Sequence, residues 1–231
     1  MSSAELPVPP VLPVLHAVTS DDVLARGDLV ASAIAIMRAG GSRVAVHLRS
    51  GTLTAREMMR LAQELTPVQA STGARLVIND RVDLAMSVGA WGVQLTTRSI
   101  RPADARRVAP LLVVGASVHT VTDATLAERD GAAWVVAGHV YETPSHEGAA
   151  GRGEAFVREV CGRVQLPVVA IGGITPQRVG ALVAAGARGI AAIRGVWADS
   201  ANAASQACAD YLSAYDVALD RRGDDRPDRQ R

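Results

Sequence analysis

Short apolar runs rich in β-branched residues alternate with longer amphipathic stretches through most of the chain. One amphipathic stretch covers residues 55–65, where Met58, Leu61, Ala62 and Leu65 recur at the spacing of one helix face. The apolar runs predict eight strands, at residues 15–19, 43–48, 75–78, 92–95, 111–117, 133–140, 167–171 and 189–193. Strands that alternate with helices predict a parallel sheet with right-handed crossovers.

Eight such units can close on themselves, so we predict a single-domain (β/α)8 TIM barrel of the α/β class over residues 11–217. An open doubly wound sheet is the main alternative. That fold usually has a glycine-rich turn after its first strand, whereas the corresponding turn here reads HAVTSDD. In TIM barrels the active site lies at the C-terminal ends of the strands, so residues at those ends are the functional candidates.

Composition narrows the possible partners. The formal net charge of +1 gives no electrostatic case for binding nucleic acid or a membrane surface. Neither a secretory leader pattern nor a long uninterrupted apolar run is present, so we expect a cytoplasmic protein. Residues 1–10, with three prolines, and the mostly charged residues 218–231 are predicted to be disordered tails.

The sequence contains no lysine, so all 24 basic residues are arginine. Schiff-base catalysis needs a lysine amine and is therefore excluded. Any phosphate must be held by arginine, backbone N–H groups or hydroxyls. The two cysteines, Cys161 and Cys208, lack metal or redox spacing and are expected to be buried thiols in a reducing compartment.

Four of the five histidines fall in or directly after predicted strands: His16, His47, His119 and His139. Each could face the barrel mouth, although His16 and His47 could equally be hydrogen-bonded histidines of the barrel interior. A catalytic zinc site needs about three protein ligands. Because no HxH or HExxH spacing occurs, we predict no metal site.

Two segments predict phosphate contacts. The motif IGGITP places Gly172 and Gly173 after the seventh strand, and IRGVW places Ile193, Arg194 and Gly195 after the eighth. TIM barrels often hold phosphate with backbone N–H groups of these two loops. A pair of tight turns without a ligand is the alternative.

The loop at residues 141–153 is long, polar and glycine-rich, reading YETPSHEGAAGRG. Long polar loops on a rigid scaffold often cover a ligand. Glu142 and Thr143 stand at its base and are expected to lie over the mouth.

Three segments in the right order and spacing, INDRVDLA, GASVHT and PVVAIGGITP, resemble the thiamine phosphate synthase/TenI superfamily. The resemblance runs from Leu15 to about Trp197 and implies a TIM barrel that binds small phosphorylated molecules. Synthases of this superfamily condense a pyrimidine pyrophosphate with a thiazole phosphate. Their Q-x-R-x-K set after the second strand reads HLRSG here, so His47 replaces Gln, Arg49 is kept and Gly51 replaces Lys.

A second synthase set, Q-E-D after the fourth strand, helps to hold pyrophosphate and magnesium. Thr97, Arg98 and Ser99 stand at those positions, while Asp80 remains. Mg²⁺ sites are built from carboxylates and phosphates. The loss of both Lys and Asp therefore predicts disabled pyrophosphate activation.

The segments LHAVT, RVDLA, GVQL, SVHT and GHVYET are similar to the TenI thiazole tautomerases. This resemblance implies an isomerase without cofactor, which aromatises a carboxythiazole phosphate in thiamine biosynthesis by moving a proton. It also implies that His119 is catalytic, because histidine can take and give a proton near pH 7. Two alternatives stay open: a true thiamine phosphate synthase, and a non-catalytic regulatory protein that binds thiazole or thiamine phosphate.

The remaining site residues follow from the same resemblance. Arg49 would pair with the substrate carboxylate, since bidentate contacts suit that role. Gly173, Arg194 and Gly195 would hold the phosphate. The expected further substrate contacts are Asn79, His139, Glu142, Thr143, Gly172 and Ile193. The family also suggests a homodimer, with no nucleic-acid or membrane partner.

Overall fold

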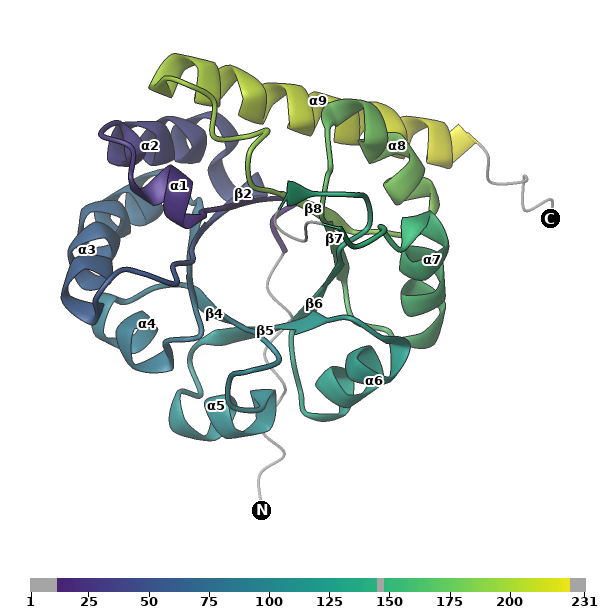
Figure 1. Ribbon diagram of the computed structural model, residues 1–231, viewed down its shortest axis with the longest axis horizontal. Coiled ribbons are helices and arrows are strands. Elements are labelled where there is room, and N and C mark those ends of the chain that lie inside the picture. Colours follow the sequence, from purple (N-terminus) through teal and green to yellow (C-terminus); the bar gives the residue numbers. More distant parts are fainter. Residues whose placement is uncertain (1–11, 145–147, 225–231) are drawn as a thin grey trace.

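The computed structural model describes residues 12–144 and 148–224. Eight parallel strands form a closed barrel in chain order, and helices surround it, as Figure 1 shows. The strands are β1 (Leu15–Val18), β2 (Val44–Leu48), β3 (Arg75–Asn79), β4 (Gly92–Leu95), β5 (Val113–Val118), β6 (Trp134–Gly138), β7 (Val168–Ile171) and β8 (Gly189–Ala192). The predicted TIM barrel is confirmed, with every strand end within two residues of its expected position.

The helical layer consists of α1 (Asp21–Leu24), α2 (Leu29–Gly40), η1 (Gly41–Arg43), α3 (Ala55–Thr72), α4 (Val82–Val88), α5 (Pro102–Val108), α6 (Val121–Arg129), α7 (Gly153–Arg163), α8 (Pro176–Ala184) and α9 (Ala201–Asp224). The helix expected at residues 55–65 is α3, which begins at a capping box of Thr54 and Glu57. It runs on to Thr72 and ends where Gly73 adopts a left-handed conformation. No helix in the described ranges is long and apolar enough to cross a membrane.

Strand alternation separates the barrel interior from the layer under the helices. On β6, Trp134 and Val136 belong to an interior cluster, whereas Val135 and Ala137 pack in the outer cluster beneath the helices. The Trp134 ring stacks on Trp91 with a centroid distance of 5.4 Å and closes the floor of the barrel. The barrel is therefore open at the C-terminal ends of the strands, where the residues after each strand line its mouth.

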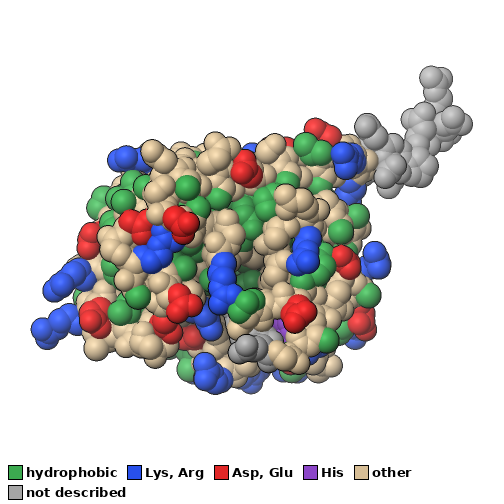
Figure 2. Space-filling model, turned by 45° about the horizontal axis from the view of Figure 1, so that its top comes forward, with side chains coloured by type: hydrophobic (Ala, Val, Ile, Leu, Met, Phe, Trp, Pro, Cys, Tyr) green, Lys and Arg blue, Asp and Glu red, His purple; other side chains and the backbone are tan. Residues whose placement is uncertain are grey.

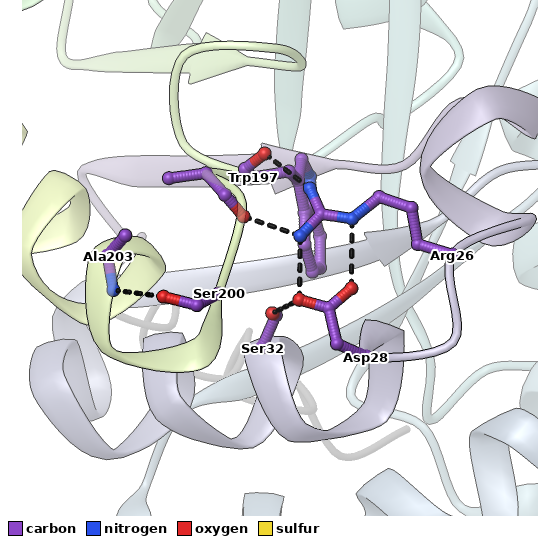
Figure 3. Close-up of polar contacts among 7 residues, drawn as sticks. Arg26, Asp28, Ser32, Trp197, Ser200 and Ala203 are labelled. Atoms are coloured by element: carbon purple, nitrogen blue, oxygen red, sulfur yellow. Dashed lines mark hydrogen bonds and ion pairs between the residues drawn. The ribbon is translucent and has the colours of Figure 1, made fainter.

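Arg26 links the two ends of the chain across the seam between β1 and β8. Its guanidinium donates to the carbonyls of Trp197 at 2.7 Å and Ala198 at 2.6 Å, and it pairs with Asp28, as Figure 3 shows. The Trp197 indole donates to the carbonyl of Val18 at 2.9 Å. These contacts join the loop after β8 to the segment after β1.

The C-terminal end corrects one prediction, because α9 continues to Asp224 and residues 218–224 are helical. Tyr215 and Ala218 are buried, and Arg222 donates to the carbonyl of Val183 at 3.2 Å. Asp220 and Arg221 are exposed on the same helix that buries Tyr215 and Ala218, so local charge was a poor guide to order. Residues 1–11 and 225–231, where disordered tails are predicted, lie outside the described residues.

Candidate active site

Two adjoining cavities open at the C-terminal end of the barrel. The first chamber has a volume of about 320 Å³ and the second chamber about 310 Å³. They share His119, Gly138, Ile171, Ala191 and Ile193 as a common wall. Figure 2 shows arginine and acidic side chains interspersed on the face drawn, with a histidine visible among them.

The two chambers contain every site residue predicted from the sequence. The first chamber is lined by His119, His139, Glu142, Thr143, Gly172, Gly173, Ile193, Arg194 and Gly195. The second chamber is lined by Arg49 and Asn79 and again by His119 and Ile193. The structure therefore divides one expected site into two compartments.

The loop after β7 is pressed against the loop after β6. Gly173 has φ of +63°, and a Cβ there would lie 2.5 Å from the carbonyl oxygen of Glu142. Only glycine meets both requirements, since a left-handed conformation and a missing side chain are needed together. This close packing fixes the position of the backbone at the rim of the first chamber.

Gly195 has a second reason to be glycine. A Cβ at this position would lie 2.3 Å from the hydroxyl of Tyr211, which donates to the carbonyl of Ile174 at 2.8 Å. Gly195 thus lets α9 approach the loop after β7.

Arg178 also lines the first chamber, although the sequence motifs did not single it out. Its guanidinium lies 4.4 Å from the centre of the Tyr141 ring and donates to the carbonyl of Gly173. Tyr141 in turn donates to Glu154 at 2.6 Å, and burial raises the pKa of its hydroxyl to about 12. The TPQR sequence at the start of α8 could have predicted this position for Arg178, because the N-terminus of the helix after β7 faces the mouth.

His119 is half-buried at the junction of the chambers. Its Nδ1 lies 2.9 Å from the carbonyl oxygen of Gly138. A carbonyl can only accept, so Nδ1 carries the hydrogen, and Nε2 of the neutral ring is an acceptor. The backbone N–H groups of His119 and Thr120 donate to Asp123 at 3.0 and 2.9 Å, which fixes the start of α6.

His16 and His47 occupy the barrel interior, the second of the two interpretations considered for them. His16 Nε2 lies 3.1 Å from the carbonyl of Pro13, and its Nδ1 lies 2.7 Å from His47 Nε2. Because Nε2 of His16 must donate, Nδ1 accepts the proton of His47. Burial lowers the pKa of His16 to about 4 and that of His47 well below its usual value, so both rings are neutral near pH 7.

Amide side chains lie deep in the second chamber. Gln94 donates to Ser117 at 3.0 Å, but its Oε1 and the Oδ1 of Asn79 are buried without a hydrogen-bond partner in the described part of the chain. Buried acceptors normally find a donor. The Asn79 side chain also interacts with His47, so the Oε1 of Gln94 is the clearer indication that a ligand or water supplies a donor here.

Asp80 is the one acidic residue of the magnesium pattern that the sequence retains. Its Oδ1 accepts from the Ser99 hydroxyl at 2.6 Å and from the Thr96 N–H at 2.8 Å. Across residues 12–144 and 148–224, no group of three or more His, Cys, Asp and Glu side chains gathers as a metal site would require. This donor set does not fit the carboxylate-held magnesium of the synthase pattern.

A closed barrel with a divided mouth and glycine turns after β7 and β8 belongs to the class of TIM-barrel proteins that handle small molecules. The chain belongs to the thiamine phosphate synthase/TenI family: the TMP-TENI model, described as thiamine monophosphate synthase, matches residues 15–196. The superfamily resemblance is thus confirmed.

Individual relatives carry synthase names. A thiamine-phosphate synthase of Methanoculleus marisnigri is 34% identical over 200 residues, covering 85% of this chain and 94% of the relative. One from Roseiflexus castenholzii is 35% identical over 212 residues, covering 90% and 92%. The solved structure of a thiamine phosphate pyrophosphorylase from Pyrococcus furiosus matches with a TM-score of 0.77 at 29% identity, covering 89% of this chain and 96% of that one.

These relatives correct the expected activity. The sequence motifs predicted an isomerase, whereas the relatives are named synthases, which are transferases, so that prediction is wrong. The segments behind it include LHAVT, which forms β1 and the residue after it, and GHVYET, which begins at the end of β6. These segments form the backbone around the mouth, and one such scaffold can support more than one reaction.

Proposed function

We propose that the protein is a transferase of the thiamine-phosphate synthase type, which joins two phosphorylated substrates at the barrel mouth. The observation that carries this proposal is the pair of adjoining chambers with His119 in their common wall. Each chamber has arginine in its lining, Arg178 and Arg194 in the first and Arg49 and Arg98 in the second. Two anionic substrates would thus meet at one junction.

In this proposal the first chamber binds the thiazole phosphate. Glycine turns after β7 and β8 bring backbone N–H groups close to a phosphate, and Arg194 adds a positive charge. Glu142, Thr143 and His139 then contact the ring side of the ligand. The second chamber receives the pyrimidine pyrophosphate, with Asn79 and Gln94 accepting hydrogen bonds from it.

The reaction breaks the carbon–oxygen bond to pyrophosphate and forms a carbon–nitrogen bond between the two rings. Orienting two substrates in one site can replace a costly bimolecular encounter. His119 contacts both substrates in this arrangement, and its Nε2 accepts a hydrogen bond from one of them. A homodimer in the cytoplasm, expected from the resemblance and the composition, remains part of the proposal and is open to sedimentation and fractionation measurements.

The test is to mix the purified protein with both substrates and Mg²⁺ and to measure thiamine phosphate and released pyrophosphate by chromatography. We expect the two products in equal amounts. Absence of both, from a protein that circular dichroism shows to be folded, would overturn the proposal.

A second candidate is a non-catalytic protein that binds a thiazole phosphate. It is favoured by Gly51, which replaces the lysine of the synthase pattern, and by the incomplete acidic set around Asp80. Thiazole phosphate would then raise the melting temperature of the protein, while both substrates together would give no product.

A further inference from the structure

We propose that the second chamber holds the diphosphate of its ligand with two arginine side chains, Arg49 and Arg98, and that Asp80 positions one of them rather than binding magnesium. The identity of the anion rests on the proposed function, which supplies a pyrophosphate substrate. The anion-binding role of the two arginines rests on the structure of the chamber.

Arg49 is held at the mouth by its backbone. Its N–H donates to the Thr19 hydroxyl at 2.8 Å, and that hydroxyl donates to the Arg49 carbonyl at 2.8 Å. Thr19 is fully buried, so this pair of bonds fixes the chain directly after β2. Arg49 lines the second chamber, and its guanidinium has no ion-pair or hydrogen-bond partner in the described part of the chain.

Arg98 is presented by a turn after β4. The Ser99 N–H donates to the Thr96 carbonyl at 3.0 Å, and Asp80 binds both residues through its Oδ1. One carboxylate oxygen, directly after β3, thus fixes both ends of the turn that contains Arg98. Arg98 also lines the chamber, and its guanidinium has no carboxylate at ion-pairing distance within residues 12–144 and 148–224.

Anion binding by two arginines accounts for three differences from the synthase pattern at once. Gly51 and Ser99 remove a lysine and a carboxylate, and Arg98 stands where the pattern has glutamate. The exchange of an acidic for a basic residue raises the positive charge of the chamber. Guanidinium groups stay charged at all physiological pH values and form paired hydrogen bonds with phosphate oxygens. Two of them offset most of the charge of a diphosphate, which the synthase pattern assigns to arginine, lysine and a metal together.

The test measures binding of inorganic pyrophosphate to the full chain by isothermal titration calorimetry, in EDTA and in Mg²⁺. We expect binding in EDTA, with an affinity changed less than about threefold by Mg²⁺. Arg49→Ala and Arg98→Ala should each weaken binding in EDTA at least about tenfold, the size expected for losing one charge-assisted contact. Arg98→Lys should fall between Arg98→Ala and the wild type.

Two further variants separate the possible causes. Arg163→Ala removes the same charge at the C-terminal end of α7, away from both chambers, and should leave binding within about twofold. Asp80→Asn keeps an oxygen that accepts from Ser99 and Thr96, so it should retain pyrophosphate binding. If Asp80 binds magnesium instead, Asp80→Asn would abolish a Mg²⁺-dependent affinity.

Pyrophosphate binding that requires Mg²⁺, or that is unaffected by Arg98→Ala, overturns the inference. Absence of binding at millimolar pyrophosphate in both buffers overturns it as well. Because the probe is pyrophosphate alone, the outcome is independent of turnover. Arginine-dependent binding without product formation would support the inference and contradict the synthase activity.

Discussion

The two chambers at the barrel mouth differ in how far their polar groups are satisfied by the protein itself. In the first chamber, Arg178 stacks on Tyr141 and binds Gly173, and Tyr141 binds Glu154. In the second chamber, buried oxygens of Asn79 and Gln94 have no partner in the described part of the chain. Cross-links between loops hold both chambers, since Asp80 ties the segment after β4 to the end of β3 in the second. The difference is that the second chamber depends on its ligand to complete its buried hydrogen bonds.

His119 belongs to both chambers, so its loss should affect both equally. His119→Asn keeps a donor for the Gly138 carbonyl but removes the acceptor Nε2. We expect product formation to fall by about 100-fold, as for the loss of one hydrogen-bonding group in a catalytic site. Steady-state kinetics with each substrate varied in turn, alongside a melting curve, would measure this. A full rate in the variant would contradict the place given to His119.

Gly173→Ala should damage the first chamber alone. A Cβ would meet the Glu142 carbonyl at 2.5 Å and would require a left-handed alanine, which costs about 1–2 kcal/mol before the clash is added. We expect a loss of about 2–3 kcal/mol in unfolding free energy and weaker thiazole phosphate binding, measured by urea denaturation and calorimetry.

Gly180→Ala is the matched control on the exposed side of α8, where a Cβ meets nothing within 4 Å. It should raise stability slightly, because alanine favours helix over glycine by up to about 1 kcal/mol. Equal effects of the two substitutions would show that the loop packing around Gly173 is unimportant. Pyrophosphate binding in the second chamber should survive both.

Acid should destabilise the buried His16–His47 pair in the barrel interior. The pKa of His16 is lowered to about 4 in the folded protein, so above pH 6.5 the ring is neutral in both folded and unfolded chains. As the pH falls from 6.5 towards 4, only the unfolded state takes up the proton, and stability decreases. Between pH 7 and pH 5 we expect a loss of about 2 kcal/mol from this group alone.

Urea denaturation at the two pH values measures this loss, and His16→Gln should reduce the difference between them. His47, whose pKa is also lowered by burial and by His16, should add to the same trend. Identical stability at pH 7 and pH 5 would contradict the buried neutral pair.

Tyr141→Phe should have the smallest effect on stability among these variants, because it removes a single hydrogen bond between loops of the first chamber. It removes the hydrogen bond to Glu154 and should cost about 1 kcal/mol of stability together with some thiazole phosphate affinity. Tyr215→Phe removes a comparable bond, to the carbonyl of Arg188 outside the chambers. It should cost similar stability in thermal melts and leave ligand affinity unchanged.

Much of the barrel could be predicted from sequence, since strand alternation and helix periodicity are local properties. The glycine turns after β7 and β8 were likewise visible as IGG and IRG. The stacking of Arg178 on Tyr141 and the bond between His16 and His47 were not, because each joins residues more than 30 positions apart. The reaction was predicted wrongly because mouth segments such as GHVYET fix a scaffold without fixing its chemistry.

The hydrogen bonds of Arg26 across the seam between β1 and β8 have a consequence for folding during synthesis. β1 pairs with β8, so one edge of the first strand has no partner until Ile190 has been synthesised. Exposed strand edges are templates for association between chains. Arg26 and Trp197 therefore meet only after nearly the whole chain has been produced, and the nascent protein must keep an open edge soluble during most of its translation.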